Sequence, residues 1–401
     1  MVRVAVTGLG PVSSIGVGVS AFADALRAGR SGISRITSFD PSGFPHQHAG
    51  EVRDFDPTEH LRRLDPARWA RSSQFAASAA RLAVQDGGLD LDRVAPGRAH
   101  AVIGTTSGES AVVEALTAQI VDGGFAAQDP ALLAQVPANR LANAVSEELG
   151  LTGESLTIAT ACSASNYAIG YGYDLLVTGE ADVVFAGGAD SVCRWAHAGF
   201  FRLGALTATA CAPFDKDRSG ILTGEGGAVL MLETFEHAQR RGARIYAELL
   251  GYGLNCDANH PVAPDPSSVA ECMRLAHRNA GVKPEEVDYV CAHGTGTPAN
   301  DTVESKAILE VFGPQPPPVS SIKSMIGHTM GAACGFGAIA SVIAIDRGFL
   351  PPTINWATPD PDLAGIDPVP NGARQADVRV VQNDGFAFGG NNAIVMLGAV
   401  A

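Results

Sequence analysis

The chain has 401 residues, with 42 acidic and 28 basic side chains and a formal net charge of −14. This acidic balance argues against nucleic acid as the main partner. A charged fraction of 17% and a hydrophobic fraction of 46% exclude an intrinsically disordered protein, and the length is sufficient for two domains.

Strand and helix patterns alternate along the whole chain, which predicts an α/β fold. The predicted strands are Arg3–Val6, Ala101–Gly104, Leu156–Ala159, Val183–Ala186, Ala228–Leu232, Ala247–Gly251, Val287–Ala292, Ser320–Ile322, Val378–Val381 and Ala393–Leu397. The predicted helices are Ser20–Ala28, Gln74–Gln85, Val136–Leu149, the segment after Cys162, Val269–Ala280, Asp301–Phe312 and a helix from about Gly331.

Two further features concern the compartment. The uncharged stretch Thr329–Ile345 is rich in Gly and Ala, and we expect a buried central helix there rather than a membrane span. The seven cysteines contain no C-x-x-C pair, so neither a disulfide framework nor a zinc site is indicated. Because the first residues read as a strand and not as a signal peptide, we expect a cytoplasmic protein.

Cys162 lies where the apolar strand Leu156–Ala159 turns into an Ala- and Gly-rich helix. The start of a helix directs free backbone N–H groups and the positive end of the helix dipole at such a thiol. This position favours the thiolate, which is the nucleophilic form, and the same N–H groups can hold a developing oxyanion. The local pattern leaves a second interpretation open, that of a small buried hydrophobic residue.

Two later segments share one design, in which a short β-type run precedes a glycine-rich turn that carries a histidine. His293 stands in His-Gly-Thr-Gly-Thr-Pro, and His328 ends the segment Lys-Ser-Met-Ile-Gly-His. A lone histidine after a strand is more often structural than catalytic. Two of them on similar loops, together with a cysteine at the end of a strand, form a candidate site.

These three segments, Thr-Ala-Cys-Ser-Ala, His-Gly-Thr-Gly-Thr-Pro and Lys-Ser-x-x-Gly-His, resemble in order and spacing the signature segments of the β-ketoacyl-acyl carrier protein synthases, or ketosynthases. The resemblance covers nearly the whole chain, with similar segments at 6–16, 213–220, 224–226, 351–355 and 385–392. It is strongest to the elongating enzymes of type II fatty-acid or polyketide systems. It implies an α/β, duplicated five-layered (α-β-α-β-α) thiolase fold, with Cys162 in the half 1–240 and both histidines in the half 241–401.

The resemblance also implies catalytic roles. Cys162 is the acylated nucleophile, and His293 and His328 donate hydrogen bonds to the enolate that malonyl decarboxylation forms. Lys323 and Glu304 make a buried charged pair that shapes the site.

The start of the helix that carries Glu304 has a plainer interpretation. Asn300 and Asp301 read as ordinary N-cap residues of that helix. Thr295 and Thr297, on the preceding loop, line the channel for the phosphopantetheine arm if the resemblance holds.

Phe386 and Phe388 lie two positions apart beside a glycine pair, and in a strand they share one face. Packing in the core is the plain interpretation. The resemblance makes Phe388 a gate between the malonyl and acyl pockets, and it makes the Phe388 N–H the second oxyanion donor beside that of Cys162. Ser107 matches a segment at the far end of the acyl pocket.

Four arginines, Arg62, Arg63, Arg68 and Arg71, cluster before the predicted helix Gln74–Gln85. The resemblance places them near the entrance for an acidic acyl carrier protein, and a solvated helix face is the alternative. It further implies a dimer without contact to a membrane, either a homodimer or a heterodimer with a chain-length-factor-like homologue. No metal or redox cofactor is expected, because the substrates arrive on the phosphopantetheine of the carrier.

The expected reaction is a decarboxylative Claisen condensation that extends an acyl chain on Cys162 by two carbons. The motifs favour polyene or aromatic polyketide synthesis, and housekeeping fatty-acid elongation is the alternative. A thiolase or a priming ketosynthase uses a Cys-His-Cys or Cys-His-Asn set instead. A non-catalytic chain-length-factor-like partner lacks the nucleophilic cysteine.

Overall fold

Each half of the chain contributes five strands to the main path of the central sheet, and the short strand β2 (Gly16–Val17) pairs with β1 beside this path. The computed structural model describes residues 2–400. The strands of the first half are β1 (Val4–Ser13), β5 (Ala99–Gly104), β6 (Ser155–Ile158), β7 (Val183–Asp190) and β9 (Gly226–Thr234). The strands of the second half are β10 (Ala247–Cys256), β11 (Tyr289–Cys291), β12 (Val319–Ser320), β15 (Val380–Phe386) and β16 (Asn391–Gly398).

The two halves repeat one topology. The strand orders are β6-β5-β7-β9-β1 and β12-β11-β15-β16-β10, which is 3-2-4-5-1 in chain order for each half. In each half, the first three strands in these orders pair in parallel, as in β6-β5-β7 and β12-β11-β15. The remaining two strand pairs of each half are antiparallel. Since β1 and β10 also pair, Val4 opposite Leu249, the halves form one continuous sheet. The duplication is therefore plain in the topology, although no repeat is obvious in the sequence.

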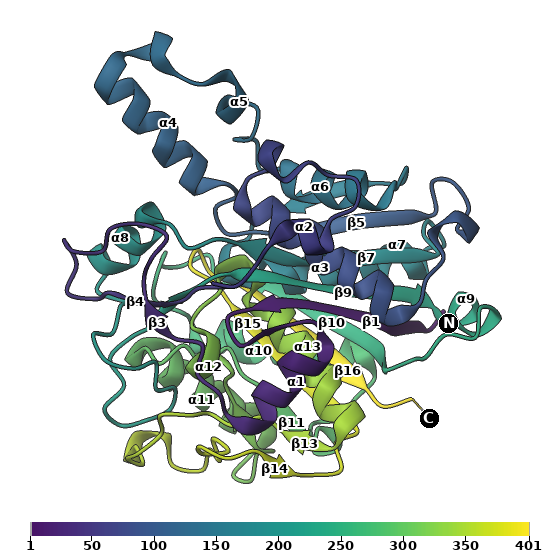
Figure 1. The fold of residues 1–401 in the computed structure, drawn as a ribbon. Coiled ribbons are helices and arrows are strands. Elements are labelled where there is room, and N and C mark those ends of the chain that lie inside the picture. Colours follow the sequence, from purple (N-terminus) through teal and green to yellow (C-terminus); the bar gives the residue numbers. More distant parts are fainter. Residues whose placement is uncertain (1, 401) are drawn as a thin grey trace.

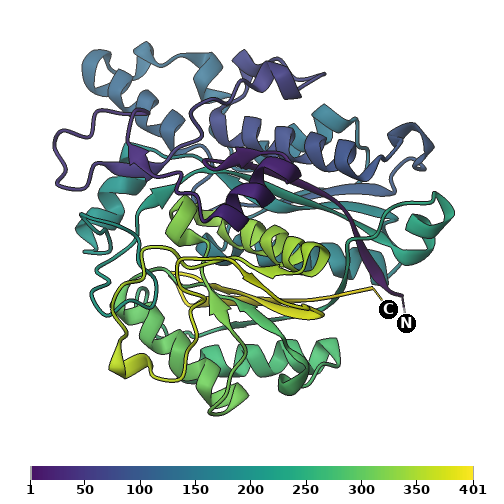
Figure 2. The same cartoon turned by 60° about the horizontal axis from the view of Figure 1, so that its bottom comes forward.

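Six helices complete a layered structure around the two halves of the sheet (Figures 1 and 2). Helices α7 (Ala164–Val177) and α13 (Ala333–Arg347) lie between the halves. The outer helices are α3 (Arg71–Gly87) and α6 (Arg140–Leu149) on the first half and α10 (Pro266–Ala280) and α11 (Pro298–Phe312) on the second. These five layers confirm the predicted fold. The predicted boundary at 240 falls at the end of α9 (Phe235–Arg240), before β10, and it stays a prediction.

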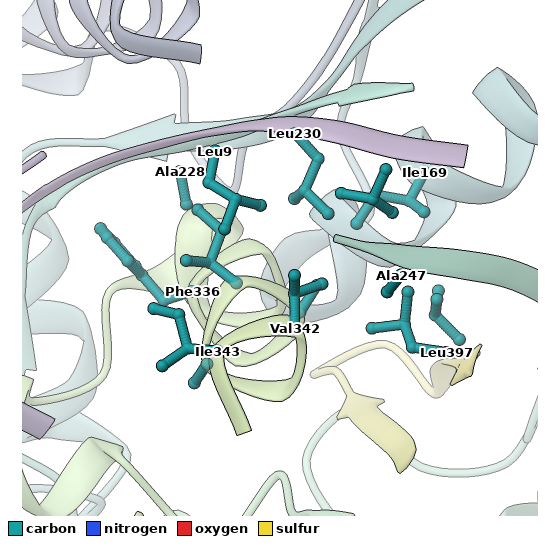
Figure 3. Close-up of a cluster of buried hydrophobic side chains, with 14 of the residues drawn as sticks. Leu9, Ile169, Ala228, Leu230, Ala247, Phe336, Val342, Ile343 and Leu397 are labelled. Atoms are coloured by element: carbon teal, nitrogen blue, oxygen red, sulfur yellow. The ribbon is translucent and has the colours of Figure 1, made fainter. Parts of the chain in front are cut away.

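The central helix α13 is covered by its neighbours on all sides, a position that suits its apolar sequence. Phe336, Val342 and Ile343 of this helix pack beneath Leu9 of β1 and Leu230 of β9 (Figure 3). The stretch Met330–Arg347 is long and apolar enough to cross a membrane, but 83% of it is buried inside the protein. The expected buried central helix is thus confirmed.

The peripheral elements connect these layers. The helices are α1 (Val19–Ala28), α2 (Pro57–His60), α4 (Ser110–Gly123), α5 (Pro130–Leu133), α8 (Arg194–Arg202) and α12 (Lys323–Ile326). The short strands are β2 (Gly16–Val17), β3 (Ser34–Arg35), β4 (His48–Gly50), β8 (Thr223–Gly224), β13 (Phe349–Leu350) and β14 (Arg374–Gln375). Helices α4 and α5 form an arm that extends away from the layers (Figure 1), and the sequence patterns did not predict it.

Candidate active site

The chemistry-bearing residues follow the carboxyl ends of parallel strands. Cys162 comes after β6, His293 after β11, and His328 after β12 and the short helix α12. Phe386 is the last residue of β15. Because β11, β12 and β15 are parallel, their carboxyl ends meet at one edge of the sheet, which brings the His293, His328 and Phe386 positions together. The strands of the other half run in the opposite direction, since β1 and β10 pair antiparallel, and the turn of Cys162 joins the site through packing between the halves, where the Cys334 thiol donates to the Cys162 carbonyl. Cys162, His293, His328 and Phe386 all line one pocket.

Cys162 sits in a tight turn with a buried side chain that is 4% exposed. Its predecessor Ala161 has a φ of 49°, in the left-handed region, which bends the chain between β6 and α7. Burial raises the pKa of the Cys162 thiol to about 11, although the Lys323 cation and the backbone N–H groups of Phe388 and Cys162 act in the opposite direction. The expectation that this position favours the thiolate is therefore wrong for the resting site, since desolvation disfavours the charged form.

The two histidine rings meet edge to face, with their centroids 5.5 Å apart and their planes at 82°. The Met330 N–H donates to Nδ1 of His328 at 3.0 Å, so the ring proton of neutral His328 is on Nε2. Nζ of Lys323 lies 3.5 Å from Nδ1 of His293, which gives His293 the same tautomer. Burial and the Lys323 cation lower the pKa of both rings, that of His328 to about 3. Both histidines are therefore neutral donors through Nε2.

Lys323 and Glu304 hold the main chain of His293 from its two ends. Lys323 donates to the carbonyl oxygen of His293 at 2.5 Å. The carboxylate of Glu304 accepts the N–H groups of His293 and Gly294, each at 2.7 Å. Both side chains are buried, as expected, but among the described residues no ion pair within 4 Å joins Lys323 to Glu304, and the role of this pair stays a prediction. Their charges act across the backbone that they both bind.

Helix α11 begins earlier than its sequence suggests, because Thr297 caps it. The Thr297 hydroxyl accepts the N–H of Asn300 at 3.3 Å, and the helix starts at Pro298. The interpretation of Asn300 and Asp301 as N-caps is therefore wrong. Asp301 is fully buried and instead accepts the backbone N–H groups of the loop that carries Thr295.

The pocket beside Cys162 has a volume of about 570 Å³ and is open to solvent on one side. The Phe388 side chain is 36% exposed, and the centroid of its ring lies 6.0 Å from that of the Phe200 ring. Strand β15 ends at Phe386, so Phe388 lies beyond the strand and the two phenylalanines do not share a strand face. Thr295 and Thr297 line the pocket, and their hydroxyl groups form a hydrogen bond to each other at 2.8 Å; their role in a channel for the carrier arm stays a prediction.

Other predicted residues lie apart from this pocket. Ser107 follows β5, where its N–H points to buried Asp190, and it is not among the pocket's lining residues. Arg71 is engaged within the fold, since its guanidinium pairs with buried Glu225 at 2.6 Å. Arg62, Arg63 and Arg68 are exposed. The roles of these residues in substrate and carrier binding stay predictions.

Sequence reasoning missed two buried carboxyl groups behind the site. Asp190, at the end of β7, accepts the Thr105 hydroxyl and the N–H of Gly331, both at 2.7 Å, and so ties the β5 loop to the His328 loop. Asp384 lies in β15 beside Glu304. A single acidic residue near a strand end gives no signal of either position in the sequence.

Comparison with known proteins identifies close relatives over the full chain. The model of the β-ketoacyl synthase N-terminal domain family matches residues 1–238, and that of the C-terminal domain family matches residues 246–357. The 3-oxoacyl-[acyl-carrier-protein] synthase 2 of Coxiella burnetii is 38% identical over 409 residues, and the match covers 99% of each chain.

Solved structures give a similar result. A chain of the ishigamide ketosynthase/chain length factor is 50% identical, with a TM-score of 0.98 over 100% of this chain and 99% of that chain. A chain of AntDE:AntF, a type II PKS acyl-carrier protein in complex with its ketosynthase bound to the hexaketide, is 31% identical. Its TM-score is 0.92, and the match covers 99% of each chain.

Proposed function

Because this chain belongs to the β-ketoacyl synthase family and is an acyltransferase-type ketosynthase, we propose that it extends an acyl chain held on Cys162 by two carbons in type II polyketide synthesis. The observation that carries the proposed chemistry is the meeting of one thiol and two neutral histidines in a single pocket, with two backbone N–H groups at the sulfur. The donor set matches the charges that develop in a decarboxylative condensation.

The first half-reaction is acyl transfer from the carrier. The Cys162 sulfur attacks the thioester carbon, and the N–H groups of Cys162 and Phe388 bind the oxyanion. Collapse breaks the bond to the carrier sulfur. The proton that Cys162 loses ends on the carrier sulfur, which leaves as a thiol; the two histidines do not accept this proton, since their Nε2 atoms already carry one.

The second half-reaction uses malonyl carrier protein. Loss of carbon dioxide leaves an enolate, whose oxygen receives the Nε2–H groups of His293 and His328. The enolate carbon attacks the acyl thioester and forms the new carbon–carbon bond. The Cys162 thiolate leaves and takes a proton from solution. Neutral histidines suit this role, because they donate hydrogen bonds without giving up the proton.

The pathway assignment is supported by the identities. This chain is 50% identical in sequence to the chain of the ishigamide ketosynthase/chain length factor, and 38% identical to the synthase 2 of Coxiella burnetii. Fatty-acid elongation is the second candidate, because the matches to synthase 2 enzymes span both chains almost completely. The mass of the acyl group on Cys162, measured in cells that carry the whole pathway, distinguishes them. An unsaturated or ketone-bearing adduct supports polyketide synthesis, and a saturated series supports fatty-acid elongation.

The chemistry is tested with Cys162→Ala. We expect this variant to lose condensation and the acyl adduct while it keeps its fold and the decarboxylation of malonyl carrier protein. Product formation at the wild-type rate by Cys162→Ala contradicts the proposed nucleophile.

We also propose that the protein works as a dimer. Strand β6 lies at an open edge of the sheet, and the arm of α4 and α5 exposes Val121 and Phe125, each 79% exposed. An apolar arm of this kind is suited to a second subunit. We expect a homodimer by light scattering at micromolar concentration. A monomeric mass contradicts the homodimer, and activity gained on adding a chain-length-factor-like protein supports a heterodimer.

A further inference from the structure

One carboxyl group behind His293 is not used by the reaction above and has an oxygen without a partner. Asp384, in β15, is 2% exposed. Its Oδ1 atom accepts a hydrogen bond from Nε2 of Gln382 at 2.8 Å, whereas its Oδ2 atom is buried and has no donor among the described residues. Buried polar atoms are nearly always paired, so the lone Oδ2 atom needs a physical explanation.

A second buried carboxyl group lies next to it. Glu304 of α11 is fully buried and within side-chain hydrogen-bonding reach of Asp384. Two ionised carboxylates offer only acceptors and repel each other, so one member of the pair carries a proton. Glu304 already accepts N–H groups from His293, Gly294 and the Asn300 side chain. Three donors favour an anion at Glu304, which leaves the proton to Asp384.

The hydrogen bonds on the other side of Asp384 run in the same direction. Nε2 of His277 donates to Oε1 of Gln382 at 2.7 Å, and the Gln382 amide donates to Asp384. With a proton on Oδ2, each donor in the row His277, Gln382 and Asp384 points toward Glu304. A proton on Oδ2 therefore gives the Asp384 end of this row a donor for Glu304, whereas Nδ1 of His277, at the other end, has no partner among the described residues.

We propose that Asp384 is a protonated positioning residue, whose Oδ2–H donates to Glu304, keeps that carboxylate ionised and so fixes the main chain of His293. Lys323 holds the carbonyl end of the same residue. This inference rests on the proposed function, because His293 matters only if the pocket performs the condensation.

The pair has few titratable neighbours. They are the Lys323 cation, Asp301 beside Glu304, and the thiols of Cys272, Cys291 and Cys334. Burial raises the pKa of both carboxyl groups above its ordinary value. The pair thus keeps one proton at neutral pH and loses it in alkaline solution, where two charges then face each other and disturb the His293 loop.

Two substitutions of Asp384 by residues of similar size distinguish a hydrogen-bond donor from a residue that only fills space. Asp384→Leu removes the donor, and we expect malonyl decarboxylation to fall about tenfold or more while acyl loading on Cys162 changes little. Asp384→Asn restores a donor without a titratable proton. We expect it to recover most of the lost rate and to move the alkaline limb of the pH–rate profile upward by about one pH unit or more.

Infrared spectroscopy tests the proton itself, independently of activity. At pH 8, burial still leaves Asp190 mostly ionised, because its pKa is about 6. We expect ¹³C-aspartate-labelled wild-type protein to show the carbonyl band of a protonated aspartic acid, and this band to be absent in Asp384→Asn.

Three results overturn the inference. They are no protonated-aspartate band in the labelled wild type, a band that persists in Asp384→Asn, and an alkaline limb that coincides in Asp384→Asn and wild type. If Asp384→Asn does not fold, the labelled wild-type spectrum decides. Failure of the proposed function gives a different result, in which wild-type protein shows the band but does not decarboxylate malonyl carrier protein.

Discussion

Replacement of His328 by alanine removes one hydrogen-bond donor from a buried site. The ring is 3% exposed, and its Nδ1 atom is occupied by the Met330 N–H, so Nε2–H is the single donor it presents to the pocket. Loss of one such donor to a developing oxyanion costs about 2.7–4 kcal/mol, which is ~10²–10³ in rate. We expect malonyl decarboxylation by His328→Ala to fall by this factor.

Conversion of malonyl carrier protein to acetyl carrier protein, followed by intact mass, measures this step alone. Acyl loading onto Cys162 is the internal control, because it depends on backbone N–H donors and should fall far less. His328→Asn is the matched variant, since its amide oxygen can accept the Met330 N–H while its nitrogen donates into the pocket. We expect His328→Asn to decarboxylate faster than His328→Ala.

The pH dependence provides a second check. Burial lowers the pKa of His328 to about 3, so well under about 1% of the ring is protonated at pH 5.5, against about nine-tenths at the ordinary pKa of ~6.5. We expect no acid limb from His328 between pH 5.5 and 8. Full-rate decarboxylation by His328→Ala refutes the assignment, as does a wild-type limb near pH 6.5 that disappears in His328→Asn.

Three further changes test the carrier surface, the acyl pocket and the core. Reversing Arg63 and Arg68 to Glu should raise KM for carrier-bound substrate and spare a small thioester mimic; equal effects on both argue against docking. Ser107→Phe should shorten the longest accepted acyl chain, and an unchanged product profile places Ser107 outside the pocket wall. Phe336→Ala should cost about 3–5 kcal/mol of unfolding free energy in denaturant titration, and a loss below about 1 kcal/mol contradicts the packing of α13.

The sequence was sufficient to predict the loops of the site, because their signals are local. Cys162, His293 and His328 each follow a short apolar strand in a glycine- or alanine-rich turn. Parallel pairing of β11 and β12 then brings the two histidine turns to one edge of the sheet, whereas their meeting with Cys162 depends on how the two halves pack. Helix α13 was predictable for a similar reason, since an uncharged stretch with many small residues fits between two layers.

The connections behind those loops could not be predicted, because they depend on side chains far apart in the chain. Glu304 and Lys323 were expected to form a buried charged pair, and the sequence did not indicate that each binds the backbone of His293. Whether a carboxylate accepts an N–H or pairs with an ammonium group is decided by small differences in position. The arm of α4 and α5 was missed because the apolar residues of α4 lie on more than one face, with Val112 and Leu116 buried and Val121 exposed, so no single apolar stripe marks the helix in the sequence.

The thiol of Cys162 shows how magnitudes decide between two sound arguments. A helix start stabilises a nearby anion by about 0.3–1 kcal/mol, and by ~2 kcal/mol at most, which is less than about 1.5 pKa units. Full burial shifts a pKa by up to about 3–5 units in the opposite direction. Burial therefore prevails, and the pKa of Cys162 rises to about 11.

This outcome fits the proposed reaction better than a resting thiolate does. A neutral thiol does not hold the N–H groups of Cys162 and Phe388 as strongly as an anion, so these donors remain available to the thioester oxygen. Deprotonation then accompanies attack on the substrate and does not precede it. The same burial keeps His293 and His328 neutral. Burial of the side chain is thus the largest influence on the protonation state of all three groups.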